Sequence, residues 1–137
     1  MKVSDCRIVN LPKIVDGRGN LSVIEEFIQV PFKIKRSHWI YDVPGGVERG
    51  GHAYKENSEF IVALSGSFDV VIRDGLDEKS FHLNRSYMGL LVPPGLWRVM
   101  NNFSTNSLAL VLSSTDFDED DYIRDFEEYK LWNETRR

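Results

Sequence analysis

The chain contains almost no cysteine and no long hydrophobic run, and each shortage excludes a class of protein. Cys6 is the only cysteine among 137 residues, so no intramolecular disulfide can form, as is usual in a reducing cytoplasm. The N-terminal segment lacks the apolar run that follows the lysine of a secretory signal. No stretch approaches the roughly 18 consecutive apolar residues of a membrane-spanning helix. We therefore expect a soluble, cytoplasmic protein with no membrane partner.

An excess of basic residues is also missing. Seventeen lysine and arginine side chains stand against twenty-one aspartate and glutamate side chains, and the formal net charge is −4. A broad nucleic-acid surface requires a net positive face, so we expect no nucleic-acid partner. A local group of basic side chains that binds a small anion is compatible with this charge. The length fits one domain with one core, which we place at residues 1–137.

Short runs with strand-like alternation occupy most of the chain. Arg36, His38 and Ile40 share one face of a predicted strand. Turn signals recur at close spacing, for example at residues 65–67 and 74–75. Short strands separated by such turns predict an all-β fold, an antiparallel sandwich or barrel. From its position His38 could line the mouth of a barrel, although the pattern assigns it no role.

The C-terminal segment has a different pattern. Aromatic and apolar residues recur near helical spacing between residues 117 and 129. Acidic residues crowd the start of this segment, and Lys130 lies towards its end, as the helix dipole favours. We expect one or two short helical turns that pack on the barrel.

A glycine-bounded stretch, residues 49–66, holds the first candidate functional residues. His52 and Tyr54 lie two positions apart, so on a strand their side chains point to the same face. In a closed barrel that face could be the inner one. Glu59 follows on the same stretch, and Arg98 lies in a second stretch that begins with proline and glycine. A histidine near a glutamate raises the question of a metal site.

Both stretches resemble the two motifs of the cupin superfamily, whose fold is a jelly-roll barrel, also called a double-stranded β-helix. The first motif is matched by His52, Tyr54, Glu59 and Gly66, and the second by Pro93, Gly95, Arg98 and Asn102. Tyrosine stands where the first motif has its second histidine, and arginine stands where the second motif has a histidine. The resemblance implies a cupin barrel, in agreement with the strand pattern.

The replaced histidines bear on metal binding. Metal-binding cupins use three histidines and the glutamate as ligands, and this chain keeps only His52 and Glu59 of the four. Arginine has no lone pair to donate, and the phenol of Tyr54 must first lose a proton whose ordinary pKa is about 10. Two ligands beside a cation make a poor divalent site. We therefore predict a site that works without a metal and an enzyme without a cofactor.

A second resemblance extends over residues 13–124. The chain is similar to the nucleotide-sugar 3,4-ketoisomerases, which act on dTDP-4-keto-6-deoxyglucose. The matching segments, in order, are "DGRGNLSVIEE", "FKIKR", "RGGHAYK", "LSGSFDVVIRDG", "GLLVPPGLW" and "DEDDYIR". Their order is more specific than any one of them. The resemblance implies an isomerase that moves the keto group from C4 to C3 through an enediol or enediolate. It would serve deoxysugar synthesis for a surface polysaccharide such as O-antigen.

The resemblance assigns the acid/base chemistry to the paired positions of His52 and Tyr54, which we predict to be catalytic. Removal of a proton at C3 requires a base of near-neutral pKa, and histidine suits that task. Tyr54 could relay a proton as a phenol. A fixed cation would stabilise the developing oxyanion, and Arg98 could face that oxygen or the pyrophosphate. Arg98 could equally pair with Glu59 for structural reasons alone.

The substrate brings two phosphates and a thymine, and side chains of two kinds suit them. Guanidinium and ammonium groups bind phosphate oxygens strongly, and a flat aromatic ring such as Trp97, Trp39 or Tyr41 could stack on the base. Glu59 would orient or polarise a neighbouring group. The predicted substrate-binding residues are Arg18, Arg49, Lys55, Glu59, Trp97 and Arg98.

Two other functions remain open on these residues. A sugar-nucleotide-binding cupin could have lost catalysis together with the second histidine, and a related epimerase could use the same fold on a similar substrate. The residue pattern does not decide which face of C4 receives a proton. The resemblance to cupins of this kind implies a homodimer. Hydrophobic edge strands that need covering fit a dimer as well.

Overall fold

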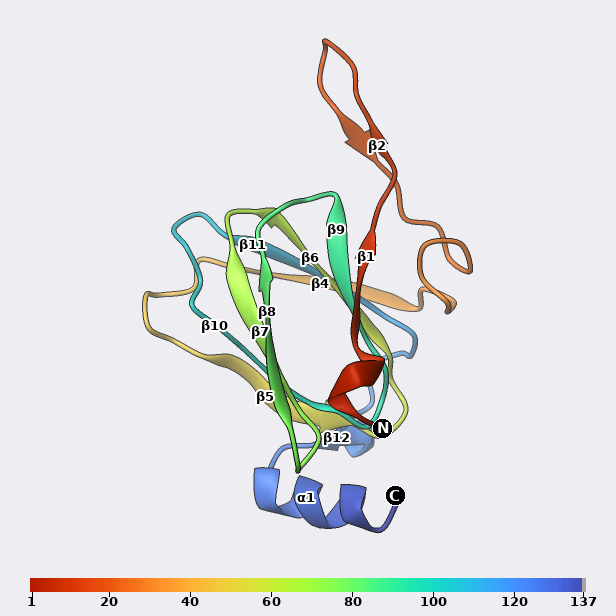
Figure 1. Ribbon diagram of the computed structural model, residues 1–137, viewed down its shortest axis with the longest axis vertical. Coiled ribbons are helices and arrows are strands. Elements are labelled where there is room, and N and C mark those ends of the chain that lie inside the picture. Colours follow the sequence, from red (N-terminus) through yellow and green to blue (C-terminus); the bar gives the residue numbers. More distant parts are fainter. Residues whose placement is uncertain (137) are drawn as a thin grey trace.

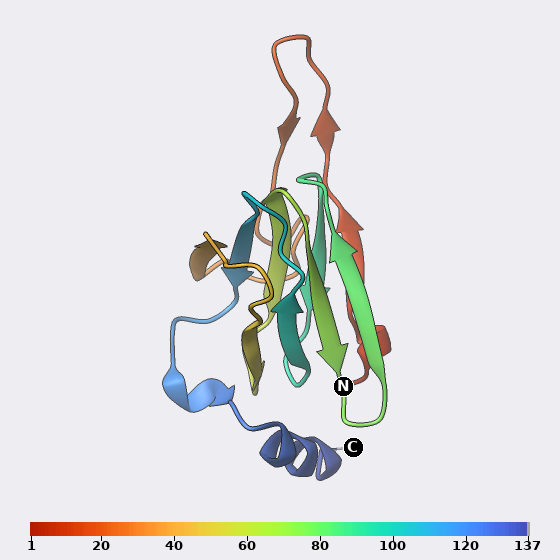
Figure 2. The same cartoon turned by 90° about the vertical axis from the view of Figure 1, so that its left-hand side faces the viewer.

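Two antiparallel five-stranded sheets face each other and form a barrel in the computed structural model, which describes residues 1–136 (Figures 1 and 2). The first sheet contains, in spatial order, β1 (Arg7–Asn10), β9 (Met88–Val92), β6 (Glu59–Ser65), β11 (Leu108–Ser113) and β4 (Arg36–Tyr41). The second contains β12 (Tyr122–Ile123), β5 (Arg49–Tyr54), β10 (Trp97–Asn101), β7 (Phe68–Arg73) and β8 (Glu78–Leu83). The expected all-β jelly roll is confirmed. Residue 137 of the expected domain lies outside the described residues.

The remaining elements lie at the two ends of the barrel. A ribbon made of β2 (Lys13–Ile14) and β3 (Leu21–Ser22) protrudes at one end, and α1 (Phe126–Glu134) lies across the other (Figure 1). The chain also forms two 3-10 helices, η1 (Val3–Asp5) and η2 (Glu119–Asp121). No helix among residues 1–136 is long and apolar enough to cross a membrane.

The short helical turns expected near the C-terminus are η2 and α1. The Asp125 carboxylate caps α1 by accepting a hydrogen bond from the Glu128 N–H at 2.9 Å. Tyr122 and Ile123, which fit the helical spacing, form β12 instead. They pair with Tyr54 and Ala53 of β5, because the edge of β5 offers backbone groups that need hydrogen-bond partners.

Strand alternation places the core and the polar groups of the barrel on the same inner faces. On β6, Glu59 and Ile61 both point inward, and on β10 so do Arg98 and Met100; all four are buried. Ile61 and Met100 belong to the apolar core between the sheets. The polar pair therefore lies at one end of the space that the core fills.

A second apolar layer covers the outer face of the first sheet. Phe60 and Leu91 of this face pack with Val30 and Phe32 from the segment between β3 and β4. Gly89 of β9 lies on the same face against the ring of Phe60, where a Cβ would overlap the ring. The close approach of strand and ring leaves no room for a side chain at residue 89.

We expect Gly89→Ala to lower the free energy of unfolding by about 1–3 kcal/mol, because an added methyl group forces a packed ring to move. Urea unfolding followed by circular dichroism measures the change. Gly45→Ala is the matched control, since nothing lies within 4 Å of a Cβ at that position. Equal stability of the two variants would contradict the packing described for Phe60.

Candidate functional site

A cavity of about 530 Å³ opens into the barrel between the two sheets. Residues that line it include His38 from β4, Arg49, His52 and Tyr54 from β5, Arg98 from β10, and Tyr122 from β12. Tyr54 and His52 share the inner face of β5, as their spacing predicts. The structure thus brings four of the eight predicted site residues to one cavity: His52, Tyr54, Arg49 and Arg98.

Three rings form one wall of the cavity. The ring of His52 lies 4.8 Å from that of Tyr54 and 5.0 Å from that of Tyr122, measured between centroids. The Tyr54 hydroxyl donates a hydrogen bond of 3.2 Å to the Tyr122 hydroxyl. His52 Nε2 is buried and makes no hydrogen bond to the described residues. One imidazole nitrogen and a pair of linked phenols are therefore available at the same wall.

A buried ion pair lies beside this wall. Arg98 Nη2 donates to Glu59 Oε2 at 2.8 Å, and Arg98 Nε lies 2.5 Å from Glu59 Oε1. The two side chains are 2% and 1% exposed. Arg98 Nη1 makes no hydrogen bond to the described residues. It lies so close to Gly50, whose φ is +78°, that a Cβ there would be 2.5 Å away.

Burial and the neighbouring charges decide which groups are ionised. Burial, Arg98, Arg124 and His38 lower the pKa of His52 to about 2, so its imidazole is neutral at pH 7. Burial and the negative charge of Glu59 raise the pKa of Tyr54 well above its ordinary value, so the phenol keeps its proton. Burial alone would disfavour the charged guanidinium of Arg98. The Glu59 carboxylate outweighs burial and raises the pKa of Arg98.

The other four predicted residues lie outside the cavity lining. Glu59 lies behind Arg98, which it holds. Trp97 points to the opposite face of β10, where its ring packs 5.2 Å from that of Phe126 beneath α1. Lys55 lies at a separate hollow with several acidic residues. Arg18 lies on the ribbon, 91% exposed, and pairs with Asp16 at 2.9 Å.

Two further residues of the site, Tyr122 and Arg124, were not predicted from the sequence. Tyr122 was expected on a helix, and its contact with Tyr54 depends on a strand pair that joins distant segments. Arg124 lines the cavity, and its guanidinium lies 4.2 Å from the Tyr122 ring centroid. The segment "DEDDYIR" gave a signal for both residues through the family resemblance, but no role for either side chain.

The donor set does not suit a divalent metal. Glu59, the carboxylate of the cupin ligand set, is committed to Arg98. No group of three metal-ligating side chains gathers among residues 1–136. A cation at Arg98 would also repel a metal ion placed beside His52.

We expect Arg98→Met to lower the free energy of unfolding by about 3–5 kcal/mol, because it leaves the Glu59 carboxylate buried and unpaired. The double variant Glu59→Leu with Arg98→Met should recover most of this loss, since two apolar side chains of similar volume can replace a buried pair. Chemical denaturation of the three proteins measures both effects. A double variant no more stable than Arg98→Met would show that the pair does not behave as one unit.

Comparison with known proteins places the chain among enzymes. The family described as "FdtA: WxcM-like, C-terminal" matches residues 4–134. A curated relative from Aneurinibacillus thermoaerophilus, TDP-4-oxo-6-deoxy-alpha-D-glucose-3,4-oxoisomerase, is 40% identical over 126 residues. The match covers 92% of this chain and 91% of the relative.

Solved structures agree with that relative. A 3,4-ketoisomerase from Helicobacter canadensis is 38% identical, with a TM-score of 0.92 over 95% of this chain and 98% of the other. QdtA, a sugar 3,4-ketoisomerase from Thermoanaerobacterium thermosaccharolyticum solved with TDP, is 33% identical, with a TM-score of 0.95 over 98% of both chains. A variant of QdtA was solved with TDP-4-keto-6-deoxyglucose. This chain belongs to the family of cupin-type TDP-sugar 3,4-ketoisomerases.

Proposed function

We propose that this chain moves the keto group of dTDP-4-keto-6-deoxyglucose from C4 to C3, with His52, Tyr54 and Arg98 as the acting side chains. One observation carries the proposal. A neutral imidazole, a protonated phenol and a guanidinium with an unpaired N–H group line the same cavity. Relatives that are named for this isomerisation, one of them bound to TDP-4-keto-6-deoxyglucose, support the choice of substrate.

The isomerisation begins with a proton transfer from carbon. The C3–H bond breaks, its electron pair forms a C3=C4 double bond, and the C4 carbonyl oxygen becomes an enediolate oxygen. The reaction then needs the loss of the C3 hydroxyl proton and the delivery of a proton to C4. Carbon 3 is oxidised as carbon 4 is reduced, so the substrate supplies its own oxidant and reductant.

His52 is the base of the first step in this proposal. Its neutral imidazole can accept the C3 proton through Nε2, which no described protein group occupies. The negative charge that develops on the substrate stabilises the resulting imidazolium and raises the pKa of His52. The low pKa that His52 has without substrate therefore does not prevent catalysis.

Arg98 and Tyr54 act on the oxygen at C4. Arg98 Nη1 can donate a hydrogen bond to the enediolate oxygen, and Glu59 already holds the guanidinium in place. A charge that needs no reorganisation stabilises a transition state more than a mobile one does. Tyr54 gives its phenolic proton to the same oxygen and regains one from protonated His52, whose ring lies at 4.8 Å. Arg49 lines the same cavity and can bind the diphosphate, whereas Arg124 is already paired with Glu119 at 2.8 Å.

The proposal predicts isomerisation by the chelator-treated protein. With dTDP-4-keto-6-deoxyglucose in deuterated water, proton NMR should show a 3-keto sugar with deuterium at C4. His52→Asn should lower the rate about 10²- to 10⁴-fold, as loss of a general base does. His82→Asn is the matched control, because that histidine is exposed on β8 and pairs with Asp69 at 2.6 Å.

The other outcomes of this experiment separate the alternative functions. Substrate that binds but stays unchanged would favour a non-catalytic sugar-nucleotide-binding cupin. A new epimer without a 3-keto signal would favour an epimerase. Substrate that neither binds nor reacts would overturn the ligand assignment.

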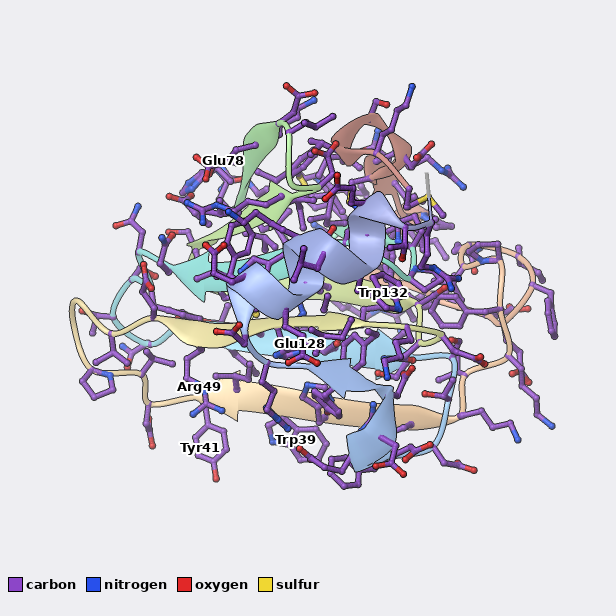
Figure 3. All side chains as sticks on the ribbon, turned by 90° about the horizontal axis from the view of Figure 1, so that it is seen from below. Trp39, Tyr41, Arg49, Glu78, Glu128 and Trp132 are labelled. Atoms are coloured by element: carbon purple, nitrogen blue, oxygen red, sulfur yellow. The ribbon has the colours of Figure 1, made fainter. Side chains whose placement is uncertain are left out.

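We also propose that the chain forms a homodimer through the outer face of β4. Trp39 and Tyr41 point away from the barrel on this strand and are 58% and 62% exposed (Figure 3). Leu64 and Leu110 lie on the same outer face of the neighbouring strands. An exposed apolar patch of this kind marks a contact surface, and a second copy of the chain would cover it. The dimer would work in the cytoplasm, on sugars for a surface polysaccharide such as O-antigen.

Light scattering on the purified protein should give about twice the monomer mass of 15.8 kDa. Trp39→Ser should shift the mass towards the monomer, because it removes apolar area from the contact. Phe117→Ser is the control, since Phe117 is also exposed but does not belong to β4. A wild-type protein of monomer mass would contradict the dimer.

A further inference from the structure

The second half of the isomerisation still lacks an acid/base group. After the first half, one group must take the proton of the C3 hydroxyl and another proton must reach C4. Tyr54 cannot act as this base near neutral pH, because burial and Glu59 keep its phenol protonated. The family resemblance has a second imidazole at residue 54, and this chain does not. A further imidazole at the cavity would supply the missing acid/base group.

His38 lies where such an imidazole is needed. Side chains alternate along β4: Ser37, Trp39 and Tyr41 are exposed, and Arg36, His38 and Ile40 are partly buried. Figure 3 shows Trp39 and Tyr41 on the outer side of this strand. His38 precedes Trp39 and therefore points the opposite way, into the barrel. There it lines the same cavity as His52, Tyr54 and Arg98.

We propose that His38 is the second acid/base residue of the site, and that it takes the C3 hydroxyl proton and delivers a proton to C4. This inference rests on the proposed function and deepens it. β4 belongs to the first sheet and β5 to the second, so the two imidazoles approach the cavity from different walls of the barrel. His38 on β4 thus supplies the second imidazole, which β5 lacks at residue 54.

The surroundings of His38 suit this role. The ring lines the cavity and makes no side-chain hydrogen bond to residues 1–136, so no described protein group holds its nitrogens. The charged groups around it are Arg36 on its own strand, Arg49 on β5, Glu59 on β6 and Arg98 on β10. Burial lowers the pKa of His38, Glu59 raises it and the three arginines lower it further, with a net decrease. At pH 7 the ring is neutral and can accept a proton.

The two halves of the reaction then balance without a further reactant. In the first half, the C3 proton passes to His52, and Tyr54 protonates O4 and is reprotonated by His52. In the second half, the O3–H bond breaks as His38 takes the proton and C3=O forms. As C3=O forms, the electron pair of the C3=C4 bond moves to C4 in the same step and takes that proton from His38 to make the C4–H bond. Both histidines and Tyr54 end in their starting protonation states.

The remaining histidine cannot serve this purpose. The chain has three histidines, and His82 is exposed on β8, where it pairs with Asp69. His82→Asn therefore leaves both imidazoles of the cavity in place. It removes the same chemical group as His38→Asn and serves as the matched control.

Two rates in deuterated water test the proposal: deuterium exchange at C3 of the substrate, and formation of the 3-keto product. Without His38 the enediol still forms and returns, but C4 receives no proton. We expect His38→Asn and His38→Gln to lower product formation about 100-fold or more, and C3 exchange by less than about threefold. His82→Asn should leave both rates at the wild-type value. Circular dichroism identifies the variants that are folded.

Either of two results would overturn the role of His38. Product formation within about threefold of wild type in a folded variant would show that the ring is not needed. An equal loss of exchange and product formation would show that His38 only shapes the cavity. A wild-type protein that gives neither exchange nor product would instead overturn the proposed function itself, and the role of His38 with it.

Discussion

The buried ion pair of Glu59 and Arg98 is the interaction on which the rest of the site depends. Neither charge could stay in the barrel alone, because an unpaired buried charge costs several kcal/mol. The pair joins β6 of one sheet to β10 of the other, so it also fixes the distance between the sheets at this end. Its geometry leaves one N–H group of Arg98 for a ligand and leaves no room for a side chain at Gly50. The stability of the barrel and the proposed chemistry therefore both require Glu59 and Arg98 to stay paired.

Three neighbours of the pair are kept in defined protonation states by the same charges. Arg98 disfavours a proton on His52 and on His38, and Glu59 disfavours loss of the proton from Tyr54. The cavity thus holds two neutral imidazoles and a neutral phenol beside the buried guanidinium of Arg98. A site of this kind can move several protons without changing its own net charge, which suits an isomerisation that neither gains nor loses atoms.

Much of this site could be predicted from local sequence patterns. Alternation along β5 placed His52 and Tyr54 on one face, and the motif match brought Arg98 to them. The same alternation, applied to β10, would have turned Trp97 away from Arg98, because adjacent residues on a strand point to opposite faces. Tyr122 could not be predicted in this way. Its two-residue strand exists because β5 offers an edge, and spacing within the segment pointed to a helix.

The contact between Tyr54 and Tyr122 joins residues 68 positions apart in the chain. Non-local contacts of this kind form late in folding, since the loop between them must close first. A chain that has formed the other strands of both sheets but has not yet docked β12 would leave His52 and Tyr54 without the covering ring of Tyr122. The part of their burial that Tyr122 supplies is therefore acquired only when the C-terminal segment reaches the barrel. A chain whose other strands have already paired therefore does not yet have a complete active site.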